Sequence, residues 1–215
     1  ARVLLLDRTV VFKLDTNDDG EITQLQYRKP DKSEGALTAK IFVIAAHAIE
    51  TPKLLLMSAS DKYKNGLANS SDQVGRNLMD HPTQLSYALA NDPMGPYRSP
   101  LATAGIEDLR DGEFRAQRSA YRLEIGNDGW SWPGQDPVSW ASQQIENGMW
   151  GTELYKQVSQ FHVRTVRMAA LTEQLPDPNS RVTLSDKLDD IGIPRPQLNY
   201  VVDDYSEQGR KDAQA

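Results

Sequence analysis

The stretch "AKIFVIAAHAIETPKLLLMS", residues 39–58, constrains the fold of this chain more than any other. Its first part, "IFVIAA", is apolar nearly throughout, which is typical of a strand covered on both faces, as in a parallel sheet flanked by helices. Thr51 then suits a helix N-cap, and Pro52 suits the first helical position, where no N–H is needed. The stretch therefore predicts a buried strand that runs almost directly into a helix.

The end of this predicted strand carries two small residues, Ala45 and Ala46. Small side chains let another backbone or a flat ligand approach closely, and ligands of open α/β sheets bind at the C-terminal ends of strands. A plain buried strand and helix would have the same residues, because a protein has few ligand sites of this kind. The residue types alone leave both interpretations open.

Composition sets the outer limits. The chain has 215 residues, enough for one large or two small domains, and its net charge of -6 without a cluster of Lys and Arg argues against nucleic acid as a partner. It has no cysteine, hence no disulfide, thiolate metal site or cysteine nucleophile, and its three histidines lack the spacing of metal ligands. No apolar run approaches the roughly 20 residues of a membrane span.

Short β-rich runs precede the opening stretch, at Val3 to Leu6, Thr9 to Leu14 and Ile22 to Tyr27, and predict a meander. Between the last two lies "DTNDDG", which copies the start of an EF-hand loop. The copy has Gln26 at the twelfth position, where a glutamate should close the calcium shell, and strands rather than helices flank it. The pattern favours a hairpin with Gly20 at positive φ over a calcium loop.

The second half of the chain is less informative. Residues 160–174, "QFHVRTVRMAALTEQ", predict a strand, Glu173 and Arg181 are expected to form a structural ion pair, and Asp204 is expected to open a capping box. All four tryptophans lie between Trp130 and Trp150, in loop-like text. Two uses remain for them: stacking on a sugar ring, or packing of the domain or a partner subunit.

Three stretches carry a resemblance to a known family: residues 39–58, residues 67–82 ("LANSSDQVGRNLMDHP") and residues 173–205 ("EQLPDPNSRVTLSDKLDDIGIPRPQLNYVVDDY"). They resemble the glucose-methanol-choline (GMC) family of flavin oxidoreductases, in particular its gluconate, sorbitol and glucose dehydrogenase large-subunit branch. Two positions depart from the family pattern, His47 and Ala59, where that pattern has glycine.

The resemblance implies an α+β fold: the rim of an FAD-binding α/β domain plus a mostly antiparallel-sheet substrate domain with helices on one face. Residues 1–80 are expected to form a partial FAD-binding domain, and residues 81–215 a substrate-binding domain truncated at its C-terminus. We expect an internal fragment, with the Gly-x-Gly-x-x-Gly turn that binds the pyrophosphate before Ala1 and the catalytic histidine base beyond Ala215. No catalytic residue is therefore expected in this chain.

The resemblance also implies a cofactor site. The backbone of Val11 is expected to meet the adenine of FAD, and Ala45, Ala46 and His47 are expected near the adenosine half. His47 has a second interpretation, as a histidine satisfied within its own loop.

For the substrate, the resemblance points to His81, since a histidine has a pKa in the range that tunes proton transfer. The alternative is a histidine that tethers its loop beside Asp80. No metal site is expected.

The function implied for a full-length parent is oxidation of the CH–OH group of a sugar, polyol or aldonic acid by hydride transfer to FAD, on the periplasmic side of a membrane. A small subunit and a cytochrome c subunit are the implied protein partners. Residues 1–215 alone are expected to be inactive and to bind FAD weakly. The alternative from a different class is a stand-alone α+β binding or interaction domain without catalysis.

Overall fold

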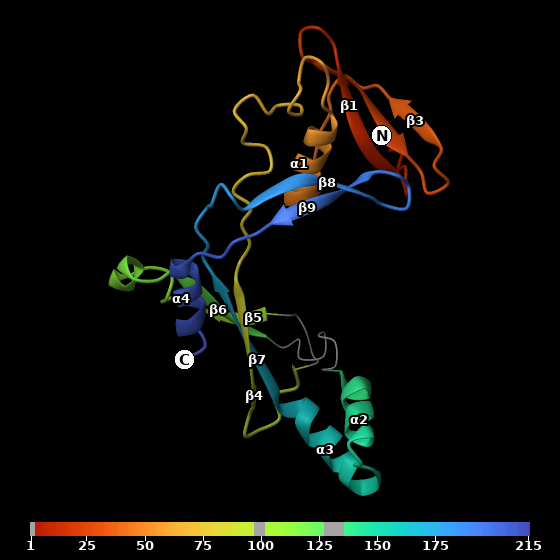
Figure 1. Ribbon diagram of the computed structural model, residues 1–215. Helices are drawn as coiled ribbons and strands as arrows, with labels where there is room; N and C mark the ends of the chain where they lie inside the picture. Colours follow the sequence, from red (N-terminus) through yellow and green to blue (C-terminus); the bar gives the residue numbers. More distant parts are fainter. Residues whose placement is uncertain (1–2, 97–101, 127–135) are drawn as a thin grey trace. The chain divides into compact units, whose positions relative to one another are not determined.

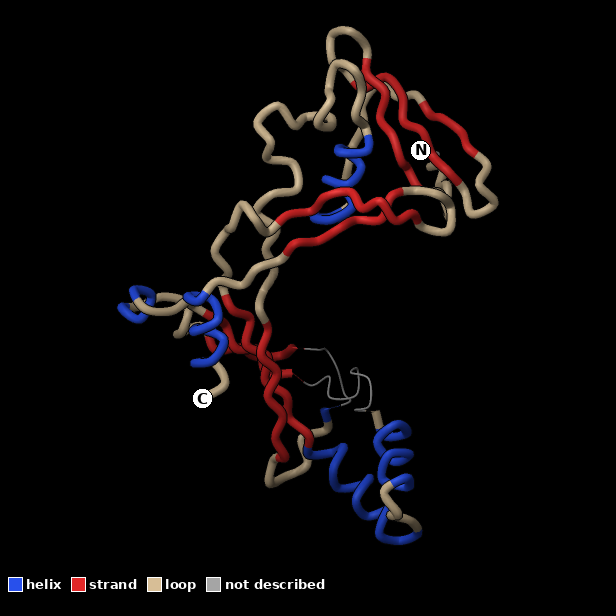
Figure 2. The backbone as a smooth tube through the Cα atoms, viewed as in Figure 1, coloured by secondary structure: helices blue, strands red, loops and turns tan. Residues whose placement is uncertain are grey.

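The computed structural model describes residues 3–96, 102–126 and 136–215 (Figure 1). The chain forms two compact units, residues 1–79 with 176–201 and residues 80–175 with 202–215. Every strand pairing in the described residues is antiparallel, and helices accompany the sheets in both units (Figure 2). The predicted α+β class is confirmed.

The first unit combines a three-stranded meander, one helix and a separate two-stranded hairpin. Its elements are β1 (Val10–Thr16), β2 (Ile22–Arg28), β3 (Glu34–Leu37), α1 (His47–Met57), β8 (Arg181–Leu188) and β9 (Pro194–Asn199). Buried Leu14 of β1, Leu54 of α1 and Leu67 form the centre of its core. The core therefore joins the meander to α1.

The turn between β1 and β2 is a hairpin, as predicted. Gly20 has a φ of 87°, and Asn17 closes the turn by accepting the N–H of Glu21 on its side-chain oxygen at 2.8 Å. Asp15, the first residue of the EF-hand-like text, accepts hydrogen bonds from the side chains of Gln24 and Gln26 at 3.2 and 2.6 Å. The polar side chains of the EF-hand-like stretch thus form hydrogen bonds within the hairpin itself.

Two predicted strands are wrong. Residues 3–6 and the predicted strand at residues 41–46 are extended but belong to no sheet, and Val3, Ile41 and Val43 are 91%, 80% and 85% exposed. A strand requires a neighbouring strand to hydrogen-bond with, and the described residues provide none here. The expected burial of residues 41–46 on both faces is therefore absent.

The helix after this segment begins earlier than predicted. Ala46 is the N-cap of α1, so Pro52 lies inside the helix rather than at its first position. Thr51, expected as the cap, instead accepts the N–H of Ala46 on its hydroxyl at 3.1 Å. His47 makes the early start possible, because its Nδ1 accepts the N–H of Ile49 at 3.0 Å and so satisfies one first-turn donor.

The β8–β9 hairpin packs on α1, although the sequence-based division placed these residues in the second domain. It is tied to residues 75–78 by two backbone bonds, from the N–H of Val182 to the carbonyl of Gly75 and from the N–H of Leu78 to the carbonyl of Ser180, both 2.8 Å. Gly75 has a φ of 83°, and a Cβ there would lie 2.3 Å from the Val182 carbonyl oxygen. This contact accepts only glycine.

The second unit is built on a four-stranded sheet with the order β4-β7-β6-β5. Its elements are β4 (Thr83–Leu89), β5 (Ala102–Ile106), the short helix η2 (Glu113–Ala116), β6 (Tyr121–Gly126), α2 (Pro137–Glu146), α3 (Gly151–Arg164), β7 (Thr165–Thr172) and α4 (Asp204–Asp212). The first third of the expected strand at residues 160–174 is thus helix, because α3 continues to Arg164 before β7 starts.

Two other expectations on this half of the chain are corrected. Glu173 pairs with Arg115 at 3.0 Å, and Arg181 pairs with Asp72 at 3.2 Å, so the expected ion pair between Glu173 and Arg181 is not formed. Proximity along the chain misled here, because residue 173 lies in the second unit and residue 181 in the first.

The last helix begins one residue before the predicted position. Asp203 rather than Asp204 is the N-cap of α4, and it accepts the N–H of Ser206 at 2.9 Å. Of the tryptophans, Trp140 stacks on Phe161 with ring centroids 4.8 Å apart, Trp150 is exposed, and Trp130 and Trp132 lie outside the described residues.

Candidate functional site

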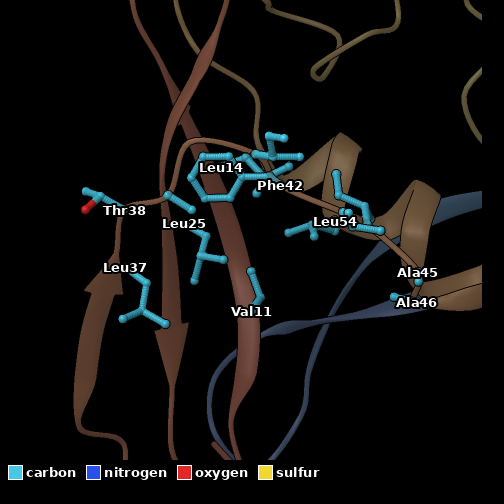
Figure 3. A pocket seen from close by; sticks show the side chains of 13 residues that line it. Val11, Leu14, Leu25, Leu37, Thr38, Phe42, Ala45, Ala46 and Leu54 are labelled. Atoms are coloured by element: carbon cyan, nitrogen blue, oxygen red, sulfur yellow. The ribbon is translucent and has the colours of Figure 1, made fainter. Parts of the chain in front are cut away.

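A cavity of about 560 Å³ lies in the first unit, between the meander, α1 and the extended segment that precedes α1. Figure 3 shows Val11, Leu14 and Leu25 on the strands, with Leu54 reaching in from α1. Its lining is apolar apart from one threonine and consists of Val11, Leu14, Leu25, Leu37, Thr38, Ala39, Ile41, Phe42, Val43, Ile44, Ala45, Ala46 and Leu54. Such a cavity suits a flat apolar group.

Three of the four residues expected at the cofactor border this one cavity. Val11 lies on β1, and Ala45 and Ala46 lie where the extended segment meets α1 (Figure 3). The sequence separates Val11 from the two alanines, and the fold brings them together. Both alanines are exposed, so no larger side chain occupies this end of the cavity.

The backbone beside the cavity has free hydrogen-bonding capacity. Residues 39–44 form no backbone–backbone hydrogen bond with any residue that the structure describes. Their N–H and C=O groups are therefore available to a planar heterocycle that carries donors and acceptors, or to another strand. An adenine ring has such edges and an apolar face, so these residues fit the adenosine end of FAD.

His47, the fourth expected residue, does not line the cavity. It follows Ala46 directly, is exposed, and has a φ of 55°, in the left-handed region that glycine adopts without strain. This backbone conformation explains why a glycine suits the position. The imidazole Nδ1 accepts a helix N–H, which agrees with the interpretation of a histidine satisfied within its own loop.

His81, the residue expected at the substrate, lies just before β4 in the second unit and is exposed. Its N–H donates to the carboxylate of Asp80 at 2.8 Å, and its carbonyl accepts the hydroxyl of Thr83 at 2.8 Å. These bonds fix the backbone of the loop and leave the imidazole outside them. The alternative interpretation required a contact between His81 and Asp80. The backbone N–H of His81, and not its imidazole, makes that contact.

Sequence reasoning missed most of the cavity wall. Phe42 and Leu54 line it together with Leu14 and Leu25 of the meander. In the segment from Ile41 to Ile44 the structure half-buries Phe42 and Ile44 and exposes their neighbours, a period of two, but all four residues are apolar, so the sequence carried no such signal. Leu14 and Leu25 could not be recognised, because their place in the wall depends on the packing of α1 over the meander.

Comparison with known proteins adds the following findings. Residues 2–83, which include the cavity, match the family model of GMC oxidoreductase. The chain is 37% identical over 203 residues to the fructose dehydrogenase large subunit of Gluconobacter japonicus, which covers 94% of this chain and 36% of that protein. It is 53% identical over 45 residues to 2-methyl-1,2-propanediol dehydrogenase of Mycolicibacterium austroafricanum, covering 21% of this chain and 8% of that protein. The chain thus spans about a third of the first relative's length.

Proposed function

The chain belongs to the GMC oxidoreductase family, whose cofactor is FAD, and on this premise we propose that its first unit holds the adenosine half of FAD in a sugar or polyol dehydrogenase. The observation that carries the proposal is the apolar cavity shared by Val11, Ala45 and Ala46 within the residues that match the family model. FAD supplies the acceptor for the hydride that leaves the alcohol carbon.

The chain's own residues would bind and orient. Val11, Ala45 and Ala46 leave space for the adenine, and the unpaired backbone groups of residues 39–44 offer it hydrogen bonds. The sequence has no Gly-x-Gly-x-x-Gly turn for the pyrophosphate. Residues 1–215 alone are therefore proposed to bind FAD weakly and to be inactive.

The substrate side of the proposal rests on the second unit. We assign substrate binding to residues 80–175 and 202–215, with His81 beside the reacting alcohol, and the substrate class to the CH–OH group of sugars, polyols or aldonic acids. The relative's name contains "fructose dehydrogenase", which supports a sugar-like substrate. Substitution of His81 by Asn should raise KM several-fold with folding intact, whereas an unchanged KM and kcat would remove His81 from the site.

Protein partners and location are proposed on the same relative, which is named a large subunit. A smaller subunit and a cytochrome c subunit are the proposed partners, with the complex facing the periplasm. Of the helices that the structure describes, none has the length and apolarity needed to cross a bilayer.

The decisive experiment measures flavin in the complete natural reading frame that contains residues 1–215. Ala45→Phe should fill the adenine end of the cavity and lower FAD affinity at least about tenfold, since a ring that overlaps the ligand forces one of them out. Ala36→Phe adds the same ring on β3 outside the cavity and should keep FAD.

Two results would contradict the proposal. The first is full FAD occupancy in Ala45→Phe, which would move the adenine elsewhere. The second is a yellow, dye-reducing preparation of residues 1–215 alone, which would show that this chain already contains the phosphate grip and the base.

A further inference from the structure

Asparagine is followed directly by glycine at two places in the sequence, Asn65-Gly66 and Asn147-Gly148. In such a pair the backbone nitrogen of the glycine can attack the side-chain amide carbon of the asparagine, because glycine has no Cβ to hinder the approach. The attack requires the peptide between the two residues to rotate out of its folded position. The chemistry of the two pairs is the same, so the structure around each pair decides which one reacts.

The first pair is held by the core of the first unit. Gly66 is buried, and a Cβ there would lie 2.9 Å from the Cα of Leu56. The next residue, Leu67, donates its N–H to the carbonyl of Leu55 at 2.8 Å, and its own side chain is part of the buried core cluster. Rotation of the peptide between Asn65 and Gly66 would therefore disrupt packed contacts, and such an opening costs free energy.

The second pair lies at the C-terminal end of α2. Asn147 is the C-cap, and Gly148 follows it with a φ of 87°, the left-handed conformation that ends many helices. Gly148 donates its N–H to the carbonyl of Ile145 and Met149 donates to the carbonyl of Gln144, both at 2.9 Å. These bonds give the glycine a structural role. They belong to the end of a helix, where backbone hydrogen bonds open most readily.

The surroundings of this second pair are open. Asn147 and Gly148 are both exposed, and a Cβ at Gly148 would meet no heavy atom within 4 Å beyond its chain neighbours. Among the residues that the structure describes, the side-chain amide of Asn147 has no hydrogen-bond partner. The amide is therefore free to turn towards the nitrogen of Gly148, and rotation of the peptide between them displaces no packed side chain.

We infer that Asn147 is a site of spontaneous deamidation in the folded protein and that Asn65 is protected from it. The nitrogen of Gly148 loses its proton to solvent and attacks Cγ of Asn147. The new N–C bond closes a succinimide ring, and the bond from Cγ to the amide nitrogen breaks as that nitrogen takes up a proton and leaves as ammonia. Water then opens the ring at either carbonyl, which leaves aspartate or isoaspartate without any oxidation or reduction.

The modification changes the connection between α2 and α3 in two ways. Either product places a carboxylate at the C-terminal end of α2, where the helix dipole disfavours negative charge. Isoaspartate also routes the main chain through the former side chain, which disrupts the hydrogen bonds that Gly148 and Met149 make to the last turn. Deamidation is therefore expected to loosen the junction of the two helices, whose contact includes the stacked rings of Trp140 and Phe161.

The test incubates the full-length natural protein that contains residues 1–215 in mildly alkaline buffer and assigns each modified asparagine by mass spectrometry of its peptides. In the folded protein, Asn147 should deamidate at least about tenfold faster than Asn65, because the packed site opens rarely and the helix end opens often. In urea the two pairs are equally accessible, so their rates should converge. The unfolded protein thus supplies the intrinsic rate of each pair.

Asn147→Gln is the matched variant, since it keeps an exposed amide on a longer side chain that does not close the succinimide ring, and it should abolish the modification at this position. Circular dichroism verifies that the incubated protein stays folded. Equal rates at Asn147 and Asn65 in the folded protein, or a faster rate at Asn65, would overturn the inference. The same holds if Asn147 reacts in urea but stays unmodified in the folded protein. None of these outcomes bears on FAD binding, so the proposed function is tested separately.

Discussion

Two apolar segments of this chain each adjoin a helix, yet only one of them forms a strand. Residues 39–46 lead into α1 without pairing, and Val43 among them is 85% exposed. Strand β7 follows α3, lies between β4 and β6, and buries Ala169 and Ala170 to 3% and 2% exposure. An apolar composition therefore shows only that a segment has side chains suited to burial. Whether those side chains are buried depends on the pairing of the segment with neighbouring strands.

The largest expected effect lies in β7. Ala170→Asp would force a carboxylate between Gln84 and Leu123 in the packed centre of the sheet, and overpacking together with burial of a charge costs about 3–5 kcal/mol. Urea unfolding followed by circular dichroism should show the second unit lost or strongly destabilised. Val43→Asp is the matched change in the unpaired segment and should alter stability by less than about 0.5 kcal/mol. Equal losses in both would break the comparison.

The next effect should appear beneath the unpaired segment. Leu14 is 3% exposed and packs with Leu54 and Leu67, so Leu14→Ala should destabilise the first unit by about 2–5 kcal/mol through lost burial and a cavity. Leu37→Ala, at a position 41% exposed, should cost much less. If Leu37→Ala lowered the free energy of unfolding more than Leu14→Ala, contacts of Leu37 next to the unpaired segment would stabilise this unit more than the core between β1 and α1.

A smaller effect concerns the helix that covers the sheet of β7. The carboxylate of Asp203 accepts both the N–H and the hydroxyl of Ser206, at 2.9 and 2.7 Å. Asp203→Ala should lower stability by about 1 kcal/mol, the usual worth of an N-cap. Asp204→Ala removes the residue that sequence alone selected as the cap and should be nearly neutral. The reverse order would restore the sequence-based position of the cap.

The smallest effect is a pH dependence in the meander. A hydrogen bond from Gln26, with help from Gln24 and Lys13, lowers the pKa of Asp15 below its ordinary value of 3.8. The folded state therefore favours the carboxylate, so this contribution to stability is present above pH 3.8 and is lost as the pH falls through the lower, folded pKa. Asp15→Asn should make the free energy of unfolding less dependent on pH below pH 3.8, and an unchanged pH dependence would contradict this contribution.

The sequence predicted the features that depend on local chemistry. The hairpin at Gly20, the α1 helix and a helix near Asp204 follow from turn residues, caps and periodicity. It did not predict which apolar runs find partners, as residues 3–6 and 39–46 demonstrate, because strand pairing is set by segments far apart in the chain. The start of α1 was missed because a histidine at positive φ, His47, replaces the cap that Thr51 had suggested.

The candidate site divides in the same way. Ala45 and Ala46 were recognisable as a small-residue strand end, and Val11 by its match to the family pattern. The apolar wall from Leu14, Leu25 and Leu54 emerges only when α1 folds over the meander. The strand register of the second unit was equally unpredictable, since Arg122 and Arg167 share one face of its sheet through pairings that no local pattern encodes.

The return of residues 176–201 to the first unit has a consequence for biosynthesis. During synthesis, α1 leaves the ribosome long before β8 and β9 are made. The first unit therefore cannot complete its fold while the residues of the second unit are synthesised. Such long sequence separation between contacting elements slows folding. Until residue 201 has emerged, α1 therefore lacks the hairpin that packs on it, and chaperone binding should concentrate on this helix.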